Sequence, residues 1–142
     1  PGSGCCTPSC NGTPCGASDG CSGTCALGSG CVNTAPRGYL DVIDVVASNV
    51  AGWAYDPDTP SLSIDIHFYV DGTAPGDFAG AASANLFRPD VNAAFGITGN
   101  HGFNWSIPAP YRSGTHTLYV FALDSAGGSN PQVDQSPMVF SY

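Results

Sequence analysis

The sequence predicts an all-β protein: an immunoglobulin-like antiparallel β-sandwich of about seven strands, preceded by a small N-terminal disulfide-rich loop segment. The chain of 142 residues contains no Glu and no Lys, so the common charged helix formers are missing. Its 19 Gly and 12 Pro favour short strands joined by tight turns. All seven Cys lie at or before Cys31, which sets a cross-linked segment apart from the remainder of the chain.

The N-terminal segment holds every cysteine and almost no other apolar residue, so it cannot fold by burying a core. The cysteines are Cys5, Cys6, Cys10, Cys15, Cys21, Cys25 and Cys31. Because the segment has no His and no paired C-x-x-C, zinc is the weaker alternative to disulfides. Disulfides persist in oxidising compartments, which predicts a secreted, extracellular or cell-surface protein. Seven is odd, so we expect three disulfides and one remaining Cys, with the pairing left open.

The composition then changes from Cys-rich to β-branched and aromatic, which divides the chain into residues 1–36, the disulfide-rich segment and linker, and residues 37–142, the sandwich. The predicted strands are Tyr39–Val46, Asn49–Tyr55, Ser63–Val70, Phe78–Asn85, Gly102–Ile107, Thr115–Leu123 and Pro137–Tyr142. None of them contains Cys, so the inter-sheet disulfide of antibody domains is missing. An up-and-down barrel is the alternative architecture.

Alternation along these strands predicts the core, because side chains two residues apart share one face of a strand. The predicted core residues are Ile64, Ile66, Phe68, Val70, Phe103, Trp105, Ile107, Leu118 and Val120. Trp53, which shares a face with Ala51 and Tyr55, is also expected in the core rather than at the surface.

Residues 86–100 form the one long irregular connection of the predicted sandwich. Pro89 and Asp90 favour a single helical turn, since Pro fits a first turn and Asp there faces the positive end of the helix dipole. Arg88 is expected to pair with Asp56 or Asp58 across the loops. Connections of this length in compact domains are often functional.

The charge narrows the choice of partners. Eleven Asp and three Arg give a net charge of −8, which repels nucleic-acid phosphates and anionic lipid surfaces. No apolar run reaches the ~20 residues of a membrane-spanning helix. We therefore expect neither nucleic-acid binding nor membrane insertion, whereas an uncharged polysaccharide or a cation such as calcium is allowed.

Four motifs in the sandwich carry a resemblance to a known family. They are Gly52-Trp53-Ala54-Tyr55-Asp56-Pro57-Asp58, Val70-Asp71-Gly72, Arg88-Pro89-Asp90-Val91 and Gly99-Asn100-His101-Gly102-Phe103. Together they resemble a β-sandwich module that recurs in secreted bacterial cell-wall amidases, peptidases and glycoside hydrolases, over about residues 39 to 125. The resemblance implies an accessory, non-catalytic role and carries no ligand with it. The stretch from Cys15 to Cys25 resembles the short Cys/Gly repeats of bacterial surface proteins.

Three tyrosines are the predicted ligand-binding residues, because an aromatic ring can stack on the apolar face of a sugar. Tyr55 ends a strand, Tyr69 lies on the polar face of Ser63–Val70, and Tyr111 lies in a loop. Each of the three is expected to face solvent.

We expect neither a metal site nor a catalytic site. The Asp residues in or beside loops are Asp56, Asp58, Asp71, Asp77 and Asp90, and they lack calcium-loop spacing, so turn formation is preferred over calcium binding. His67, His101 and His116 lie on separate elements, and no nucleophile elbow or metalloprotease motif is visible. His101 is expected to pack or to bond a loop carbonyl, and the chain is not expected to be an enzyme.

Two functions fit these expectations. The preferred one is a non-catalytic extracellular binding module that attaches a secreted enzyme or a cell to polysaccharide or cell-wall glycan, because aromatic residues without catalytic groups fit adsorption. The alternative is a structural subunit of an extracellular fibre or adhesin, which would self-associate through sheet edges and the N-terminal Cys segment.

Overall fold

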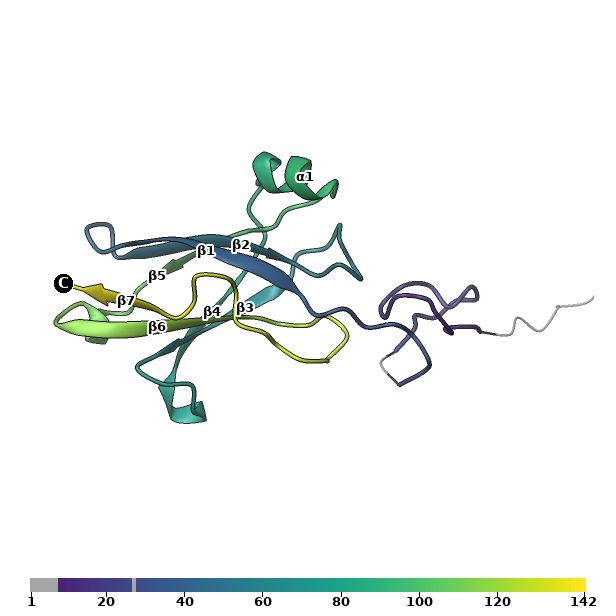
Figure 1. Cartoon of the computed structure of the whole chain (residues 1–142), viewed down its shortest axis with the longest axis horizontal. Helices are drawn as coiled ribbons and strands as arrows, with labels where there is room; N and C mark the ends of the chain where they lie inside the picture. Colours follow the sequence, from purple (N-terminus) through teal and green to yellow (C-terminus); the bar gives the residue numbers. More distant parts are fainter. Residues whose placement is uncertain (1–7, 27) are drawn as a thin grey trace, which may run out of the picture.

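The computed structural model describes residues 8–26 and 28–142. They form a β-sandwich from which the Cys-rich segment extends at one end, while the C-terminus lies at the opposite end (Figure 1). The strands are β1 (Arg37–Asp44), β2 (Asn49–Tyr55), β3 (Asp65–Val70), β4 (Phe78–Ser83), β5 (Gly102–Ser106), β6 (Thr115–Ala122) and β7 (Met138–Ser141). All seven predicted strands are therefore present in the described chain.

The strands form two antiparallel sheets, one ordered β1-β2-β5 and the other β4-β3-β6-β7. The predicted immunoglobulin-like sandwich is confirmed, and the two separate sheets argue against the alternative of a closed barrel. β3 lies inside the four-stranded sheet, between β4 and β6. Its inward face carries the alternating apolar residues that the sequence pattern predicts for the core.

The core lies between the two sheets. All nine predicted core residues belong to it: Ile64, Ile66, Phe68, Val70, Phe103, Trp105, Ile107, Leu118 and Val120. Phe68 stacks on Trp105 with a ring-centroid separation of 4.3 Å and meets Phe103 edge-on at 5.8 Å. These rings join the two sheets, because Phe68 lies on β3 and the other two lie on β5.

The prediction for Trp53 is wrong, because β2 presents its other face to the core. Val50 and Ala54 are fully buried, and Gly52 faces inward with them. Phe103 fills the space above Gly52, where an added Cβ would lie 2.5 Å from the Phe103 ring. The small residues are thus inside because a phenylalanine from β5 packs against them, and Trp53 lies on the outer face.

Three short helices lie in the connections. They are η1 (Pro75–Asp77), α1 (Pro89–Phe95) and η2 (Ala109–Tyr111). α1 replaces the predicted single turn with seven residues, and it ends at Gly96, whose left-handed φ of 64° caps the helix. Within the described chain, no helix has the length and apolar character needed to cross a membrane.

The N-terminal segment is cross-linked as predicted. Disulfides join Cys10 to Cys25 and Cys15 to Cys31, and Cys21 is also disulfide-bonded. Cys5 and Cys6 lie outside the described residues, so the prediction of three disulfides and one odd cysteine stays a prediction. The disulfides indicate an oxidising, extracellular type of environment.

The linker after the Cys-rich segment is hydrogen-bonded to two loops of the sandwich. The Thr34 amide donates to Asp58 over 2.7 Å, and the Asn33 side-chain amide donates to Asp124 over 2.7 Å. Both acceptor carboxylates are buried. Asp58 therefore accepts a hydrogen bond from the linker and does not form the predicted ion pair with Arg88.

Candidate functional site

A groove of about 490 Å³ lies beside Trp53, where the start of β1, the end of α1 and the segment before β7 meet. Its lining residues are Pro36, Arg37, Gly38, Trp53, Phe95, Pro131, Gln132 and Asp134. We call it the Trp53 groove. Its walls come from four separate segments of the chain, so no short sequence motif predicts it.

Two aromatic rings, those of Trp53 and Phe95, line the Trp53 groove. Trp53 is partly exposed, and its ring lies 5.1 Å from that of Phe95, which is 39% exposed. The ring of Tyr55 stacks with that of Trp53 at 6.2 Å and also contacts Phe95 at 5.2 Å, so the three rings contact one another. The groove therefore offers apolar ring surface to solvent.

Tyr55 itself is not the solvent-facing residue that the sequence predicts, because only 5% of it is exposed. Phe95 covers one side of its ring, and His101 meets it edge-on at 5.9 Å. The buried Tyr55 ring packs against the Trp53 ring. The exposed ring surface on this face belongs to Trp53 and Phe95.

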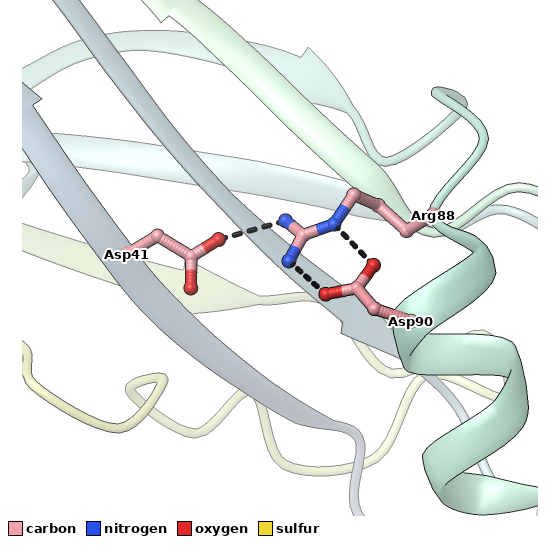
Figure 2. A network of polar contacts seen from close by, with 3 residues as sticks. All are labelled: Asp41, Arg88 and Asp90. Atoms are coloured by element: carbon pink, nitrogen blue, oxygen red, sulfur yellow. Dashed lines mark hydrogen bonds and ion pairs between the residues drawn. The ribbon is translucent and has the colours of Figure 1, made fainter.

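Arg88 holds α1 in place over the outer face of the β1-β2-β5 sheet (Figures 1 and 2). Its Nε and Nη2 donate to the two carboxylate oxygens of Asp90, over 2.8 and 2.7 Å. Its Nη1 donates to Asp41 of β1 over 2.7 Å. The predicted pairing of Arg88 with Asp56 or Asp58 is wrong, because the helix turns Arg88 towards β1.

The pKa values of this cluster agree with its geometry. The hydrogen bonds from Arg88 lower the pKa of Asp90 to about 2, and those same bonds raise the pKa of Arg88. Arg88 and Asp90 are thus both charged near neutral pH. The resulting clamp fixes the start of α1, which places Phe95 at its other end against Trp53.

The wall opposite α1 is also fixed. The Asp134 amide donates to the Gly38 carbonyl, and the Leu40 amide donates back to the Asp134 carbonyl, both over 2.9 Å. The adjacent Val133 amide donates to the Val120 carbonyl of β6 over 3.0 Å. This segment bridges the two sheets, so this wall of the groove is fixed by backbone hydrogen bonds to both of them.

Three exposed polar side chains, those of Arg37, Gln132 and Asp134, line the groove around the rings. Within the described chain, Arg37 makes no side-chain hydrogen bond or ion pair, whereas Arg88 binds two carboxylates and Arg112 donates to a carbonyl. The Gln132 Oε1 accepts a hydrogen bond from the Ser136 hydroxyl over 2.9 Å, and its amide group faces the groove without a partner among the described residues. Apolar rings beside exposed donors and acceptors suit a ligand that has both an apolar face and hydroxyl groups.

Tyr69 lies on the opposite side of the molecule, on the outer face of the four-stranded sheet. Its ring meets Phe78 and Phe121 edge-on, both at 5.5 Å, and His67 meets Phe78 at 5.1 Å. We call these four residues the Tyr69 face. A hollow of about 150 Å³ beside them is also lined by Thr73. Tyr69 is partly exposed and remains a candidate ligand-binding residue.

Tyr111 lies at the end of η2, where it packs against the core and is partly buried. Its ring meets His116 edge-on at 5.6 Å. The three predicted tyrosines thus lie in three places, and the structure does not bring them together. Trp53 and Phe95, which sequence reasoning missed as site residues, are the rings that line the Trp53 groove.

His116 lies between two acceptors, so its doubly protonated form is favoured. Its Nδ1 faces the Asp71 carboxylate at 2.7 Å and its Nε2 faces the Ser113 carbonyl at 2.9 Å. The hydrogen bond with Asp71 raises the pKa of His116, and the same bond lowers the pKa of Asp71. The pair couples the turn after β3 to the start of β6.

A pH dependence of stability follows from this pair. Because the pKa of His116 is raised above its unfolded value, its contribution is fully present below about pH 6.5 and is lost as the pH rises through the folded value. We expect the urea midpoint of the protein to fall as the pH rises from about 6 to about 9. The His116→Gln variant should show a smaller fall, and equal slopes would contradict the prediction.

The loop carboxylates accept hydrogen bonds from the backbone. Asp56 is fully buried and accepts from the Asp58 amide, the Ser125 amide and the Ser125 hydroxyl. Asp77 accepts from the Ala74 amide. In residues 8–26 and 28–142, no group of three or more Asp, Glu, His or Cys side chains is placed to hold a metal ion. Turn formation accounts for the positions of these carboxylates.

His101 behaves as predicted. It is fully buried, and its Nε2 lies 2.7 Å from the Thr98 carbonyl, to which it donates. Its ring contact with Tyr55 places it beneath the aromatic rings of β2. His101 therefore supports this face from inside, and it does not line the Trp53 groove.

Comparison with protein-family models, curated proteins and solved structures gives no match to this chain. The function is therefore argued from the described residues.

Proposed function

We propose that this chain is a non-catalytic extracellular binding module that attaches a secreted enzyme or a cell to polysaccharide or cell-wall glycan. The observation that carries the proposal is the Trp53 groove, a hollow in which the partly exposed Trp53 and the exposed Phe95 lie beside three exposed polar side chains. The disulfides support an oxidising, extracellular type of environment for the chain.

The chemistry of the groove fits a saccharide. A sugar ring has an apolar face of C–H groups, which packs on an indole ring, and a rim of hydroxyls, which need hydrogen-bond partners. Arg37 supplies donors and Asp134 supplies acceptors, while Gln132 supplies both. Since the chain carries a net charge of −8, an uncharged glycan meets less long-range repulsion than an acidic one.

A non-catalytic role is supported by the groups at the groove. Among its described lining residues, Asp134 is the one carboxylate and no His or Cys is present. Glycoside hydrolysis commonly uses a pair of carboxyl groups, one of them a general acid. An accessory module of the kind that the sequence motifs resemble would bind a glycan through such a groove and leave the chemistry to a partner domain.

Trp53→Ala tests the proposal. We expect the variant to lose about tenfold in affinity for an insoluble glycan, because stacking on the indole ring is removed. The assay is a depletion isotherm with insoluble cellulose, chitin and peptidoglycan, for the wild-type protein and each variant. Circular dichroism and the urea midpoint establish that the variant is folded.

Tyr69→Ala is the matched control, since it removes one partly exposed ring from the opposite sheet. Its affinity should equal that of the wild-type protein. If Tyr69→Ala loses affinity and Trp53→Ala does not, the ligand binds the Tyr69 face instead. If the wild-type protein is retained on none of the three glycans, the proposed function is rejected.

A further inference from the structure

The four-stranded sheet has two free edges. β4 and β7 are its outer strands, and no strand of the described chain pairs with the outer side of either. A free edge presents a row of unpaired amide and carbonyl groups that another strand can bind. The three-stranded sheet differs, because Asp134 bridges to β1 and Leu86 bridges to β5.

Neither free edge carries the residues that normally block strand addition. β4 consists only of Phe, Ala, Gly and Ser, and β7 only of Met, Val, Phe and Ser. Charged side chains and prolines on an edge strand are the usual protection. The one irregularity in the β3–β4 pairing lies at Phe68/Tyr69, so the remainder of β4 keeps regular pairing.

The outward amides of β4 can be assigned. The Ala84 amide donates to the Ile64 carbonyl of the chain before β3, over 2.8 Å. Antiparallel partners alternate between hydrogen-bonded and non-hydrogen-bonded pairs, and Ala82 follows the register of Ala84. The amides of Ala81 and Ser83 therefore point away from β3, towards the free edge.

The polarity of the strands makes the two edges complementary. Each neighbouring pair in the sheet is antiparallel, so the four strands alternate in direction and β7 runs opposite to β4. A second copy that is shifted sideways along the sheet, without being turned over, brings its β4 antiparallel to β7 of the first. One such contact leaves one β4 and one β7 free, so addition continues.

Each free edge also carries an exposed apolar side chain. Phe78 of β4 is 45% exposed and contacts Tyr69 on the outer face of the sheet. Val139 of β7 is 64% exposed and points to that same face, since its neighbours Met138 and Phe140 pack against the core. Joining the two edges would cover both side chains.

We propose that copies of this chain associate edge to edge, with β7 of one copy paired to β4 of the next in a continuous antiparallel sheet. The partner is a second copy of this chain, because the free edges complement each other in polarity, composition and exposed side chains. Trp53, the main ring of the proposed glycan site, lies on β2 in the other sheet. This inference is independent of the proposed glycan binding.

Charge determines the conditions for association. Each copy carries −8, so copies repel at low ionic strength, and salt screens that repulsion over a Debye length of about 8 Å at physiological strength. β4 and β7 contain no charge, so salt does not weaken the contact itself. Association should therefore increase with salt.

The test is sedimentation velocity of the full chain, with free thiols alkylated, over a range of protein concentrations at about 0.05 and about 0.5 M NaCl. We expect an average mass that rises with concentration, does not stop at a dimer and is larger at the higher salt. Electron microscopy of the same samples should show filaments. A monomer under all conditions, or a closed dimer, would overturn the proposal.

Two variants of the exposed residue Ala81 test whether β4 forms the contact between copies. Ala81→Pro removes an outward amide, and Ala81→Lys adds a charge to the edge with no change to the backbone. Both should weaken association more than tenfold. Ala94→Lys, the same substitution at an exposed position of α1, should associate like the wild-type protein. Association that is unaffected by Ala81→Lys, or is abolished by alkylation alone, would overturn the proposal.

Discussion

Replacing Phe68 with Ala is expected to lower the free energy of unfolding by about 3–5 kcal/mol, the usual cost of deleting a fully buried phenylalanine ring. Phe68 is 0% exposed, and its ring lies parallel to Trp105, at 3° between the planes. It also touches Phe103, so the truncation opens a cavity between the two sheets. Chemical denaturation followed by tryptophan fluorescence measures the loss, since Trp105 is itself a reporter.

The adjacent Tyr69 supplies the control for this truncation. Tyr69→Ala removes a ring of similar size from the same strand, but from its partly exposed outer face. Its loss should be much smaller, because no closed cavity forms and the neighbouring rings of Phe78 and Phe121 can rearrange in solvent. Equal losses for the two variants would mean that the faces of β3 are assigned incorrectly.

The contrast between these neighbours explains why most of the fold can be predicted from the sequence. In β3, apolar residues alternate with Asp65, His67 and Tyr69, so period two alone assigns the faces. In β5, Asn104 and Ser106 mark the outer face in the same way, which places Trp105 inside. Where one face of a strand is polar, alternation determines the core.

β2 shows where that reasoning fails. Both of its faces are apolar, so alternation cannot decide between Val50, Gly52 and Ala54 on one side and Trp53 with Tyr55 on the other. Size favours the aromatic face as core, yet the structure buries the small residues. The deciding contact is Phe103, which comes from β5, about a third of the chain away in sequence. A long-range packing contact of this kind is not encoded in the local pattern.

The candidate site was less predictable than the fold for a related reason. Trp53 and Phe95 meet because α1 lies over β2, where Arg88 binds Asp41 of β1, and the sequence pattern does not determine that partner of Arg88. Gln132 reaches the groove because its segment bridges both sheets. The sequence shows that Trp53, Phe95 and Gln132 are suitable residue types, but only the tertiary structure brings them together.

Reduction of the disulfides is expected to unfold the Cys-rich segment while the sandwich stays folded. Cys15 and Cys25 are the buried hydrophobic side chains of this segment among the described residues, so little else holds it together. Their bonds close loops with sequence separations of 15 and 16 residues. In the chain-entropy treatment, a loop of that length contributes about 3 kcal/mol, which exceeds what so small an apolar cluster supplies.

The sandwich should respond differently, because its core contains no cysteine and packs sixteen buried residues between two hydrogen-bonded sheets. With a reductant present, limited proteolysis followed by mass spectrometry should show rapid cleavage before residue 33 and protection from Arg37 to Ser141. The thermal midpoint of the β-sheet signal should change little, since the sandwich core contains no residue of the Cys-rich segment. Continued protection of the reduced segment would show that packing, and not the disulfides, holds it folded. Simultaneous loss of both parts would show instead that the segment and the sandwich unfold as one cooperative unit.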